Sequence, residues 1–202
     1  MFKKVLALSP HTDDIELGCG ATLHRLKQNG ADIVVYNYSF AAQTNIGVVK
    51  NEFITNMAIL GARYEIFDYP VRTLQEHRQE ILDNLYAIQK IEHFDLVLCH
   101  STFDVHQDHQ VITNEAIRAF KNCTILGYEL PWNCIEFTTN FFVEVSEENL
   151  NFKKKMLDNY ITQSDRPFMM KGYVFDLGRI RGLQCSKPYA EAFQNIRTIY
   201  SI

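Results

Sequence analysis

Residues 4–30 read KVLALSPHTDDIELGCGATLHRLKQNG and place a strand, a polar loop and a helix in direct succession. Lys4 to Ser9 is a short apolar run with strand character. Ile15 to Gln28 has apolar residues that share much of one side of a helix, and Asn29-Gly30 is a helix stop. The stretch therefore predicts one strand–loop–helix unit of a layered α/β protein.

The alternation of strand-like and helix-like segments continues beyond this unit. We expect strands at Asp32 to Tyr38, Tyr64 to Phe67, Asp95 to Cys99, Thr124 to Tyr128 and Asn140 to Val145, and helices at Val48 to Leu60, Leu74 to Ile91, Gln107 to Phe120, Glu147 to Thr162 and Gly178 to Cys185. Strands that alternate with helices of this length indicate a mostly parallel sheet with helical crossovers. No linker or internal repeat divides the chain, so residues 1–202 are predicted to form a single α/β domain.

The composition excludes several classes of protein. Of the 202 residues, 47% are hydrophobic and 22% are charged, as in a globular protein that buries a core. The net charge is −4 and the only lysine cluster is Lys153 to Lys155, which argues against nucleic acid as a partner.

The sequence favours a cytoplasmic protein without a transmembrane segment. The apolar run after Lys3-Lys4 is too short for a signal peptide, and no stretch approaches the roughly 18 apolar residues of a membrane-spanning helix. The five cysteines are odd in number and form no CxxC pair, which is typical of reduced thiols in the cytosol.

Two polar loops follow predicted strands and are rich in metal-ligand residue types. The first contains His11, Asp13 and Asp14, and the second ends with His106-Gln107-Asp108-His109. In open α/β sheets, ligands bind beyond the carboxyl ends of the strands, where both loops are expected. Catalytic zinc sites use imidazole and carboxylate ligands, three from the protein, with one open position for water. Each loop taken alone could also be structural, because paired aspartates before a helix form a good N-terminal cap.

The first loop and its helix also carry a family resemblance. Residues 10–23, PHTDDIELGCGATL, resemble the AHPDDxExGCGGTL signature of the LmbE-like (PIG-L) N-acetylglucosaminyl deacetylases. His106 to His109 resembles the HPDH motif of that family, and Glu52 with Ala58, Leu60 and Gly61 resembles one of its helices. Lys153 to Gln163 and Gly182 to Phe193 resemble two later motifs, so the similarity spans nearly the whole chain.

The resemblance implies a Rossmann-like fold and a zinc ion held by His11, Asp14 and His109. It also implies a general base at Asp13. The choice of His109 over His106, and of zinc over another divalent metal, rests on the resemblance. It further implies an N-acetylated sugar or sugar conjugate as substrate, and it allows a homo-oligomer.

The expected reaction is hydrolysis of the N-acetyl group of an N-acetylglucosamine-type sugar. Asp13 would take a proton from the attacking water and return it to the amine, and the zinc and a protonated His106 would stabilise the oxyanion. Asp108 is expected to orient a histidine behind the metal. Alternatives are an amidase that acts on a non-sugar N-acyl conjugate, a metal-binding protein without turnover, and a nucleotide-binding module.

Three further residues are candidates for contact with the substrate. Arg166 could reach a charged group beyond the sugar, or form a surface salt bridge instead. Tyr189 and Glu191 could line the sugar pocket, or close the sheet. The sequence departs from the family at Val49, where an arginine is frequent, and at Tyr160, where a histidine is frequent.

Overall fold

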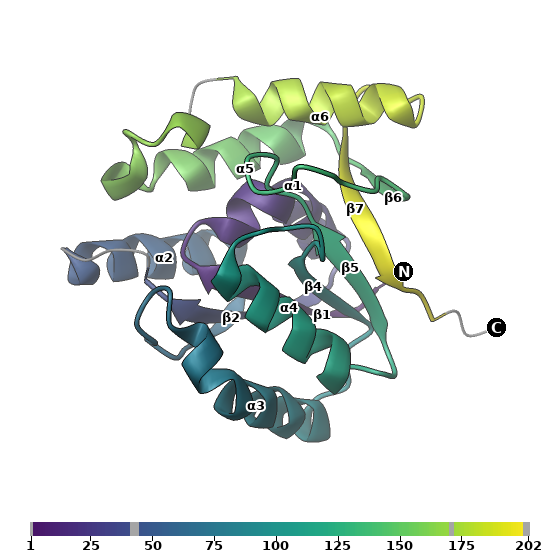
Figure 1. Ribbon diagram of the computed structural model, residues 1–202. Coiled ribbons are helices and arrows are strands. Elements are labelled where there is room, and N and C mark those ends of the chain that lie inside the picture. Colours follow the sequence, from purple (N-terminus) through teal and green to yellow (C-terminus); the bar gives the residue numbers. More distant parts are fainter. Residues whose placement is uncertain (1, 41–44, 170–171, 200–202) are drawn as a thin grey trace.

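The computed structural model describes residues 2–40, 45–169 and 172–199. Within these residues a seven-stranded sheet carries helices on both of its faces (Figure 1). The strands are β1 (Lys4–His11), β2 (Asp32–Ser39), β3 (Arg63–Ile66), β4 (Leu96–His100), β5 (Thr124–Tyr128), β6 (Phe141–Glu144) and β7 (Ala190–Arg197). The helices are α1 (Asp14–Gln28), α2 (Ile46–Leu60), α3 (Arg78–Ile91), α4 (Gln107–Ala119), α5 (Glu147–Asp158) and α6 (Tyr173–Gln184), with short 3-10 turns η1 (Leu74–His77), η2 (Ile161–Gln163) and η3 (Pro167–Met169).

The strand order β3-β2-β1-β4-β5-β7-β6 places a reversal of chain direction at the centre of the sheet. Strands β1 to β5 pair in parallel, whereas β7 is antiparallel to both β5 and β6. The chain first moves outward from β1 to β3 and then returns to place β4 on the other side of β1. The predicted mostly parallel α/β sheet is thus confirmed. Ligand sites of such sheets lie at the point of reversal, here between β1 and β4.

Alternation along β1 explains the two helical layers. Val5 and Ala7 are buried on the face covered by α1, α2 and α5, while Leu6 and Leu8 are buried on the face covered by α3 and α4 (Figure 1). Successive side chains of a strand point to opposite faces, so a strand buried on both sides must be apolar throughout. Helix α6 adds an outer layer, because its Val174 packs with α5.

The predicted helix from Glu147 to Thr162 ends earlier than expected, at Asp158. The side-chain amide of Asn159 donates to Asn56 (3.2 Å), and the hydroxyl of the buried Tyr160 donates to Glu16 (2.9 Å). These contacts with α1 and α2 replace the next helical turn, which is why the local sequence did not indicate the end of the helix.

Other boundaries also differ from the prediction. The segment from Leu74 begins as the 3-10 turn η1 before α3 starts at Arg78. The short helix expected from Gly178 starts at Tyr173. No strand was predicted at Ala190–Arg197, yet β7 joins β5 to β6 there.

The structure also describes the cysteines and the length and polarity of the helices. All five cysteines are free, and Cys99 is buried in the core at β4. In the part of the chain that the structure describes, no helix is both long enough and apolar enough to cross a bilayer.

Candidate metal centre and active site

The first polar loop lies where β1 ends and α1 begins. His11 is the last residue of β1, and Asp14 is the first residue of α1. Asp13 between them adopts a left-handed conformation with φ of 82°. This conformation is rare for residues with a side chain, although aspartate tolerates it better than most. The turn therefore allows the two neighbouring carboxylates to take the different roles predicted for them, Asp13 as general base and Asp14 as metal ligand.

The second polar loop lies where the adjacent strand β4 leads into α4. His100 ends β4, His106 precedes the first residue of α4, and His109 lies in the first turn of that helix. Because β1 and β4 are paired neighbours, the two loops meet at the point of reversal of the sheet. The two loops that the sequence singled out are thus brought together.

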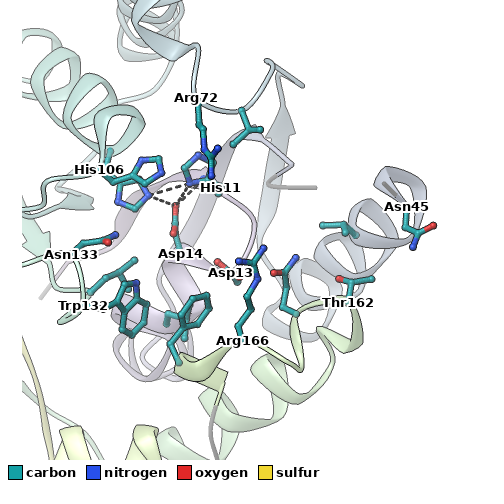
Figure 2. Close-up of a pocket in the computed structure, with 17 residues that line it drawn as sticks. His11, Asp13, Asp14, Asn45, Arg72, His106, Trp132, Asn133, Thr162 and Arg166 are labelled. Carbon is teal, nitrogen blue, oxygen red and sulfur yellow. Dashed lines mark hydrogen bonds and ion pairs between the residues drawn. The ribbon is translucent and has the colours of Figure 1, made fainter. Parts of the chain in front are cut away.

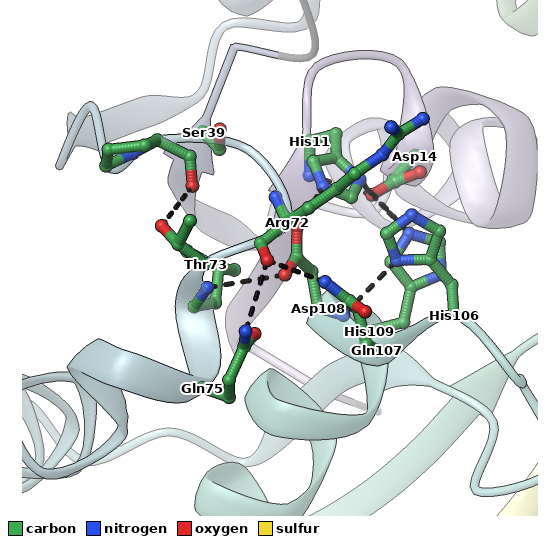
Figure 3. A network of polar contacts seen from close by, with 12 residues as sticks. His11, Asp14, Ser39, Arg72, Thr73, Gln75, His106, Gln107, Asp108 and His109 are labelled. Carbon is green, nitrogen blue, oxygen red and sulfur yellow. Dashed lines mark hydrogen bonds and ion pairs between the residues drawn. The ribbon is translucent and has the colours of Figure 1, made fainter.

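Three donor atoms from these loops form a compact triangle (Figures 2 and 3). His11 Nδ1 lies 3.1 Å from His109 Nε2, and each of these nitrogens lies 3.5 Å from Asp14 Oδ2. Ligands held about 2.1 Å from a tetrahedral zinc ion lie roughly 3.4 Å from one another. The three residues predicted as metal ligands therefore have the spacing that a tetrahedral ion requires.

Two other histidines lie close enough to belong to overlapping ligand groups. His106 forms a group with His11 and His109, and His100 forms one with Asp14 and His109, each with donor atoms within 4.8 Å. His100 is completely buried and does not line the cavity described below, whereas His11, Asp14 and His109 do. Burial therefore separates His100 from the substrate, whereas His106 lines the cavity with His11 and His109, and the choice of Asp14 as the third ligand beside them stays a prediction.

Each histidine of the triangle has a carboxylate on its other ring nitrogen. His11 Nε2 is 2.9 Å from Asp108 Oδ2, and His109 Nδ1 is 2.9 Å from Asp104 Oδ2. Such carboxylates fix the tautomer and the orientation of metal-binding histidines. Asp108 was predicted to orient a histidine in this way. Asp104 was not predicted, although it lies in the same loop five residues before His109.

Asp108 also connects the site to the loop after β3. Its carboxylate accepts hydrogen bonds from the backbone N–H groups of Arg72 (2.7 Å) and Leu74 (3.3 Å) (Figure 3). These bonds and the contact with His11 hold the pKa of Asp108 below its usual value, although burial acts in the opposite direction. Asp108 therefore remains an anion that positions both His11 and the neighbouring loop.

Behind the triangle, His100 stacks on His109 with ring centroids 3.6 Å apart. Its nitrogens lie 3.3 Å from Asp14 and 3.2 Å from Asp104. Tyr128 packs against His100 and donates to the carbonyl of Leu8 (2.8 Å). A Cβ atom at Gly18 would lie 2.1 Å from the Tyr128 ring, so this glycine permits close helix–sheet packing beneath the site.

Charges in the cluster are strongly perturbed. Burial disfavours a charged His11, but Asp108 and Asp14 outweigh this effect and raise the pKa of His11 to about 10. Burial, together with the charge of His100, lowers the pKa of His109 to about 4. Because a histidine must be deprotonated to coordinate a metal, protons and metal compete for His11.

Asp13 lies on the cavity side of the triangle, facing Arg166 (Figure 2). Burial and the negative charges of Asp14 and Glu16 raise the pKa of Asp13 well above its usual value. The positive charge of Arg166 acts in the opposite direction. A carboxylate with a raised pKa is a better proton acceptor than an exposed one, which is the property that a general base needs.

The orientation of His106 is fixed by the start of α4. Its Nδ1 accepts a hydrogen bond from the backbone N–H of Asp108 (3.2 Å). In a neutral ring the hydrogen is then on Nε2, which can act as a donor. Burial lowers the pKa of His106, and the charge of His11 adds to this effect. The side chain lines the cavity, where it can donate to a bound oxygen atom.

The donor triangle opens into a cavity of about 680 Å³ (Figure 2). One wall is formed by Trp132, which stacks on Phe168 with centroids 4.6 Å apart and remains 41% exposed. Val49, Thr162 and Arg166 also line the cavity. An aromatic wall, polar side chains and a donor triangle thus surround one space large enough for a sugar.

Residues 6–120, which contain both polar loops, match the PIG-L family, whose description is GlcNAc-PI de-N-acetylase. The chain belongs to the PIG-L family. The family is one of deacetylases, and the match covers more than half of the chain.

Individual members and structures extend the match. "Uncharacterized deacetylase YaiS" of Escherichia coli is 29% identical over 168 residues, which cover 78% of this chain and 90% of that protein. N,N'-diacetylchitobiose deacetylase of Pyrococcus horikoshii has a TM-score of 0.79 at 18% identity, covering 96% of this chain and 83% of that chain. GalB, the 4-carboxy-2-hydroxymuconate hydratase of Pseudomonas putida, has a TM-score of 0.79 at 19% identity, covering 99% and 98%. One structure is a deacetylase and the other a hydratase, so the shared fold does not by itself determine the reaction.

Two neighbouring residues of this PIG-L chain, Tyr160 and Thr162, contact glutamates of α1 and α2, and Tyr160 is one of the positions where the chain departs from the family pattern. Tyr160 is buried and donates to Glu16, whose pKa burial raises to about 7. Thr162 donates through its N–H and its hydroxyl to Glu52, which holds it in the cavity wall.

Of the three residues of this PIG-L chain that were expected to contact the substrate, one lines the cavity and two do not. Arg166 lines the cavity. Tyr189 and Glu191 do not line it. Tyr189 packs beside Phe175, and the Glu191 carboxylate pairs with the buried Lys153 at 2.7 Å.

Glu191 instead supports α1, where Cys19 has a non-helical backbone. Its carboxylate accepts from the N–H groups of Ala21 (3.3 Å) and Thr22 (2.7 Å). Those groups lie just after the kink, where α1 effectively starts again, so Glu191 caps the second segment. The geometry favours the alternative in which this part of the chain closes the fold around the site.

Proposed function

We propose that this protein hydrolyses the N-acetyl group of an N-acetylglucosamine-type sugar or sugar conjugate with the help of a divalent metal, zinc, at His11, Asp14 and His109. The observation that carries the proposal is the donor triangle with edges of 3.1, 3.5 and 3.5 Å, open to a cavity that Asp13 also lines. Membership of the PIG-L family and the similarity to YaiS support a deacetylase. The likeness to the chitobiose deacetylase is consistent with a sugar substrate.

The metal and Asp13 would divide the chemistry between them. Zinc in such a donor set lowers the pKa of a bound water to about 7 and polarises a carbonyl group. Asp13 accepts a proton as the water oxygen attacks the carbonyl carbon. It then delivers that proton to the nitrogen while the C–N bond breaks, which leaves acetate and a free amine. The raised pKa of Asp13 suits both steps.

His106 would stabilise the charge that develops on the carbonyl oxygen. Its Nδ1 is occupied by the N–H of Asp108, so its Nε2–H is the group available to the oxygen. A preorganised donor contributes most in a site that excludes water. The neutral ring is sufficient for this role, so a protonated His106, as the sequence alone suggested, is not required.

Trp132 and Phe168 would bind the sugar. Sugar rings carry apolar C–H faces that pack on aromatic side chains, and the partly exposed Trp132 lies in the cavity wall. Arg166 on the other side is close enough to Asp13 to favour its charged form, so it would act on the reacting end of the substrate.

Acetate release tests the proposal. The protein would be stripped of metal with a chelator, reloaded with zinc, and assayed on a panel of N-acetylated sugars. Acetate should appear only with the reloaded protein. Release from N-acyl amino acids but from no sugar would favour the amidase, and no release from any compound would reject the enzyme.

Metal content tests the ligand assignment separately. His109→Ala should lose bound zinc, measured by mass spectrometry of the native protein. His93→Ala is the matched control and should retain zinc, because His93 is exposed and precedes β4, whereas the triangle lies at the other end of that strand. Full zinc occupancy in His109→Ala would show that the ligands are assigned wrongly.

Two wider expectations remain proposals. A cytoplasmic location is supported by the five free thiols, since such cysteines are usual in a reducing compartment. A homo-oligomer is the other, and sedimentation of the purified protein tests it.

A further inference from the structure

A second cavity, of about 270 Å³, is lined by the second half of α1. Four residues of that helix contribute to it, and their spacing places them on one helix face: Thr22, Arg25, Leu26 and Asn29. The cavity also reaches Leu96, the first residue of β4, whereas the metal centre lies beyond His100, the last residue of that strand. The two sites therefore lie towards opposite ends of β4.

The other residues that line this second cavity are mostly apolar. Leu96 and Leu126 are buried in the core. Phe2, Phe141 and Val143 pack against that core and are only half-buried, so part of the apolar lining is open to solvent. An engineered apolar cavity of about 150 Å³ holds benzene. A cavity of about 270 Å³ therefore has room for an apolar ligand of roughly ten non-hydrogen atoms.

The hydroxyl of Thr22 is unpaired at this cavity. Thr22 is only 1% exposed, and its backbone N–H donates to Glu191 (2.7 Å), but its hydroxyl has no hydrogen-bond partner among the described residues. Buried polar groups are almost always hydrogen-bonded, because an unsatisfied one costs free energy. An unpaired hydroxyl on a residue that lines a cavity therefore points to a bound polar atom.

Arg25 adds a positive charge to the same lining. Its guanidinium donates to the backbone carbonyl of Glu144, and within residues 2–40, 45–169 and 172–199 it forms no ion pair. The carboxylate of Glu144 pairs with Lys187 instead (3.1 Å). Thr22 and Arg25 are three positions apart on α1, so their side chains are neighbours on the helix surface. The cavity thus combines an apolar lining with two adjacent donors that suit an anion.

We propose that this second cavity binds a free carboxylic acid with an apolar chain, of about the size of octanoate. The carboxylate accepts hydrogen bonds from Thr22 and Arg25, and the chain lies between α1 and β6. A purely apolar ligand would leave both donors unused, and a small anion such as acetate would leave the apolar lining in water. The site is separate from the proposed deacetylase reaction, since none of its described lining residues lines the catalytic cavity.

A series of chain lengths tests the apolar half of the site. Butanoate, hexanoate and octanoate would be titrated into the protein by calorimetry. Their affinity should rise about fourfold for each added methylene, as expected when a methylene group moves from water into an apolar site. Equal affinity for the three acids, or no binding of octanoate, would overturn the proposal.

Two variants of α1 test the polar half of the site. Arg25→Gln and Thr22→Val should each weaken octanoate binding about tenfold, because each removes a hydrogen bond to a charged group, while binding of octanol changes little. Lys27→Gln is the matched control, since it removes a positive charge from the same helix outside the cavity, and it should bind octanoate as the wild type does.

The two variants also guard against a purely structural effect. Arg25 joins α1 to β6 through the carbonyl of Glu144, so Arg25→Gln is expected to lower the Tm. Thr22→Val leaves that contact intact and keeps the test valid if Arg25→Gln does not fold. Octanoate binding of wild-type strength in Thr22→Val, and in Arg25→Gln where it folds, would show that these donors hold no carboxylate.

The single tryptophan of the chain shows where octanoate binds. Trp132 lines the catalytic cavity and not the second cavity. Octanoate should therefore bind without a change in tryptophan fluorescence, and Arg166→Gln should bind it with the affinity of the wild type. Binding that changes the fluorescence and is weakened by Arg166→Gln would place octanoate in the catalytic cavity and reject the second site.

Discussion

The two histidines of the donor triangle are supported in different ways, although each contacts a carboxylate at 2.9 Å. Asp104 is buried behind His109 and also lies 3.2 Å from His100, so one carboxylate serves two stacked imidazoles. Asp108 serves one imidazole, His11, and two backbone N–H groups of the loop after β3. One support therefore belongs to the core, and the other connects the metal site to the edge of the cavity. We expect their removal to have different consequences.

The largest loss of activity should come from a change that leaves both supporting carboxylates, Asp104 and Asp108, intact. Asp13→Ala should keep bound metal but lower kcat by about two to four orders of magnitude, because it removes the general base. Parallel measurements of zinc content and acetate release test this. Loss of zinc from Asp13→Ala would instead identify Asp13 as a ligand and require a new account of the triangle.

Removal of the Asp104 carboxylate, which we call the core support, should weaken metal binding most. Asp104→Asn takes the counter-charge from His109 and His100 together, so zinc affinity should fall about 100-fold, measured with a competing chelator. Burial acts against ionisation of Asp104, but hydrogen bonds with the two histidines hold its pKa well below the usual value. Glu115→Gln is the control, since it is a buried carboxylate of α4 that pairs with Arg78 outside the cavity. Equal zinc affinity in Asp104→Asn and Asp108→Asn would remove the distinction between the support in the core and the support at the cavity edge.

A change beneath the core support should act through packing. Gly18→Ala would place its Cβ against the Tyr128 ring, and overpacking of this kind costs about 1–3 kcal/mol of unfolding free energy. Displacement of Tyr128 should also disturb His100. Gly47→Ala is the matched control in α2, because nothing lies within 4 Å of its Cβ position. Thermal unfolding should show a lower Tm for the first variant only.

The smallest effect should come from a change to Asp108, the support at the cavity edge. Asp108→Asn should lower zinc affinity about tenfold, less than Asp104→Asn, because the carboxylate has one imidazole partner and an amide oxygen can still accept a hydrogen bond. It should also loosen Arg72, so hydrogen exchange of the Arg72 and Leu74 amides should accelerate. Unchanged exchange would show that the loop is held by other contacts.

The same contrast separates what the sequence could predict from what it could not. His11 and Asp14 were predicted because ligand-type residues crowd into short loops after apolar strands, and the family resemblance selected His109 over His106 in the second loop. Asp104 lies in one of those loops and was not assigned a role, since only the folded sheet brings it behind His109. A rule that seeks a carboxylate partner for each proposed histidine ligand could have found Asp104.

The fold shows a similar division. Strand β5 was predicted with its observed bounds because its apolar run is local. The end of α5 and the strand β7 depend on contacts with distant segments, such as Tyr160 with Glu16 and Glu191 with Lys153. Propensity carries no information about such partners. For the same reason the sequence could not place Glu191 outside the cavity, or Trp132 in its wall.

The proposed metal ligands His11 and His109 are separated by 98 positions in the chain. An unfolded chain cannot hold them 3.1 Å apart, so a metal held by both residues would bind the native state and not the denatured one. By mass action each hundredfold excess of metal over its dissociation constant then adds about 2.7 kcal/mol to the free energy of unfolding. Metal supply should thus govern how long the protein survives heat and proteolysis, and a chelator should lower its Tm even when no substrate is present.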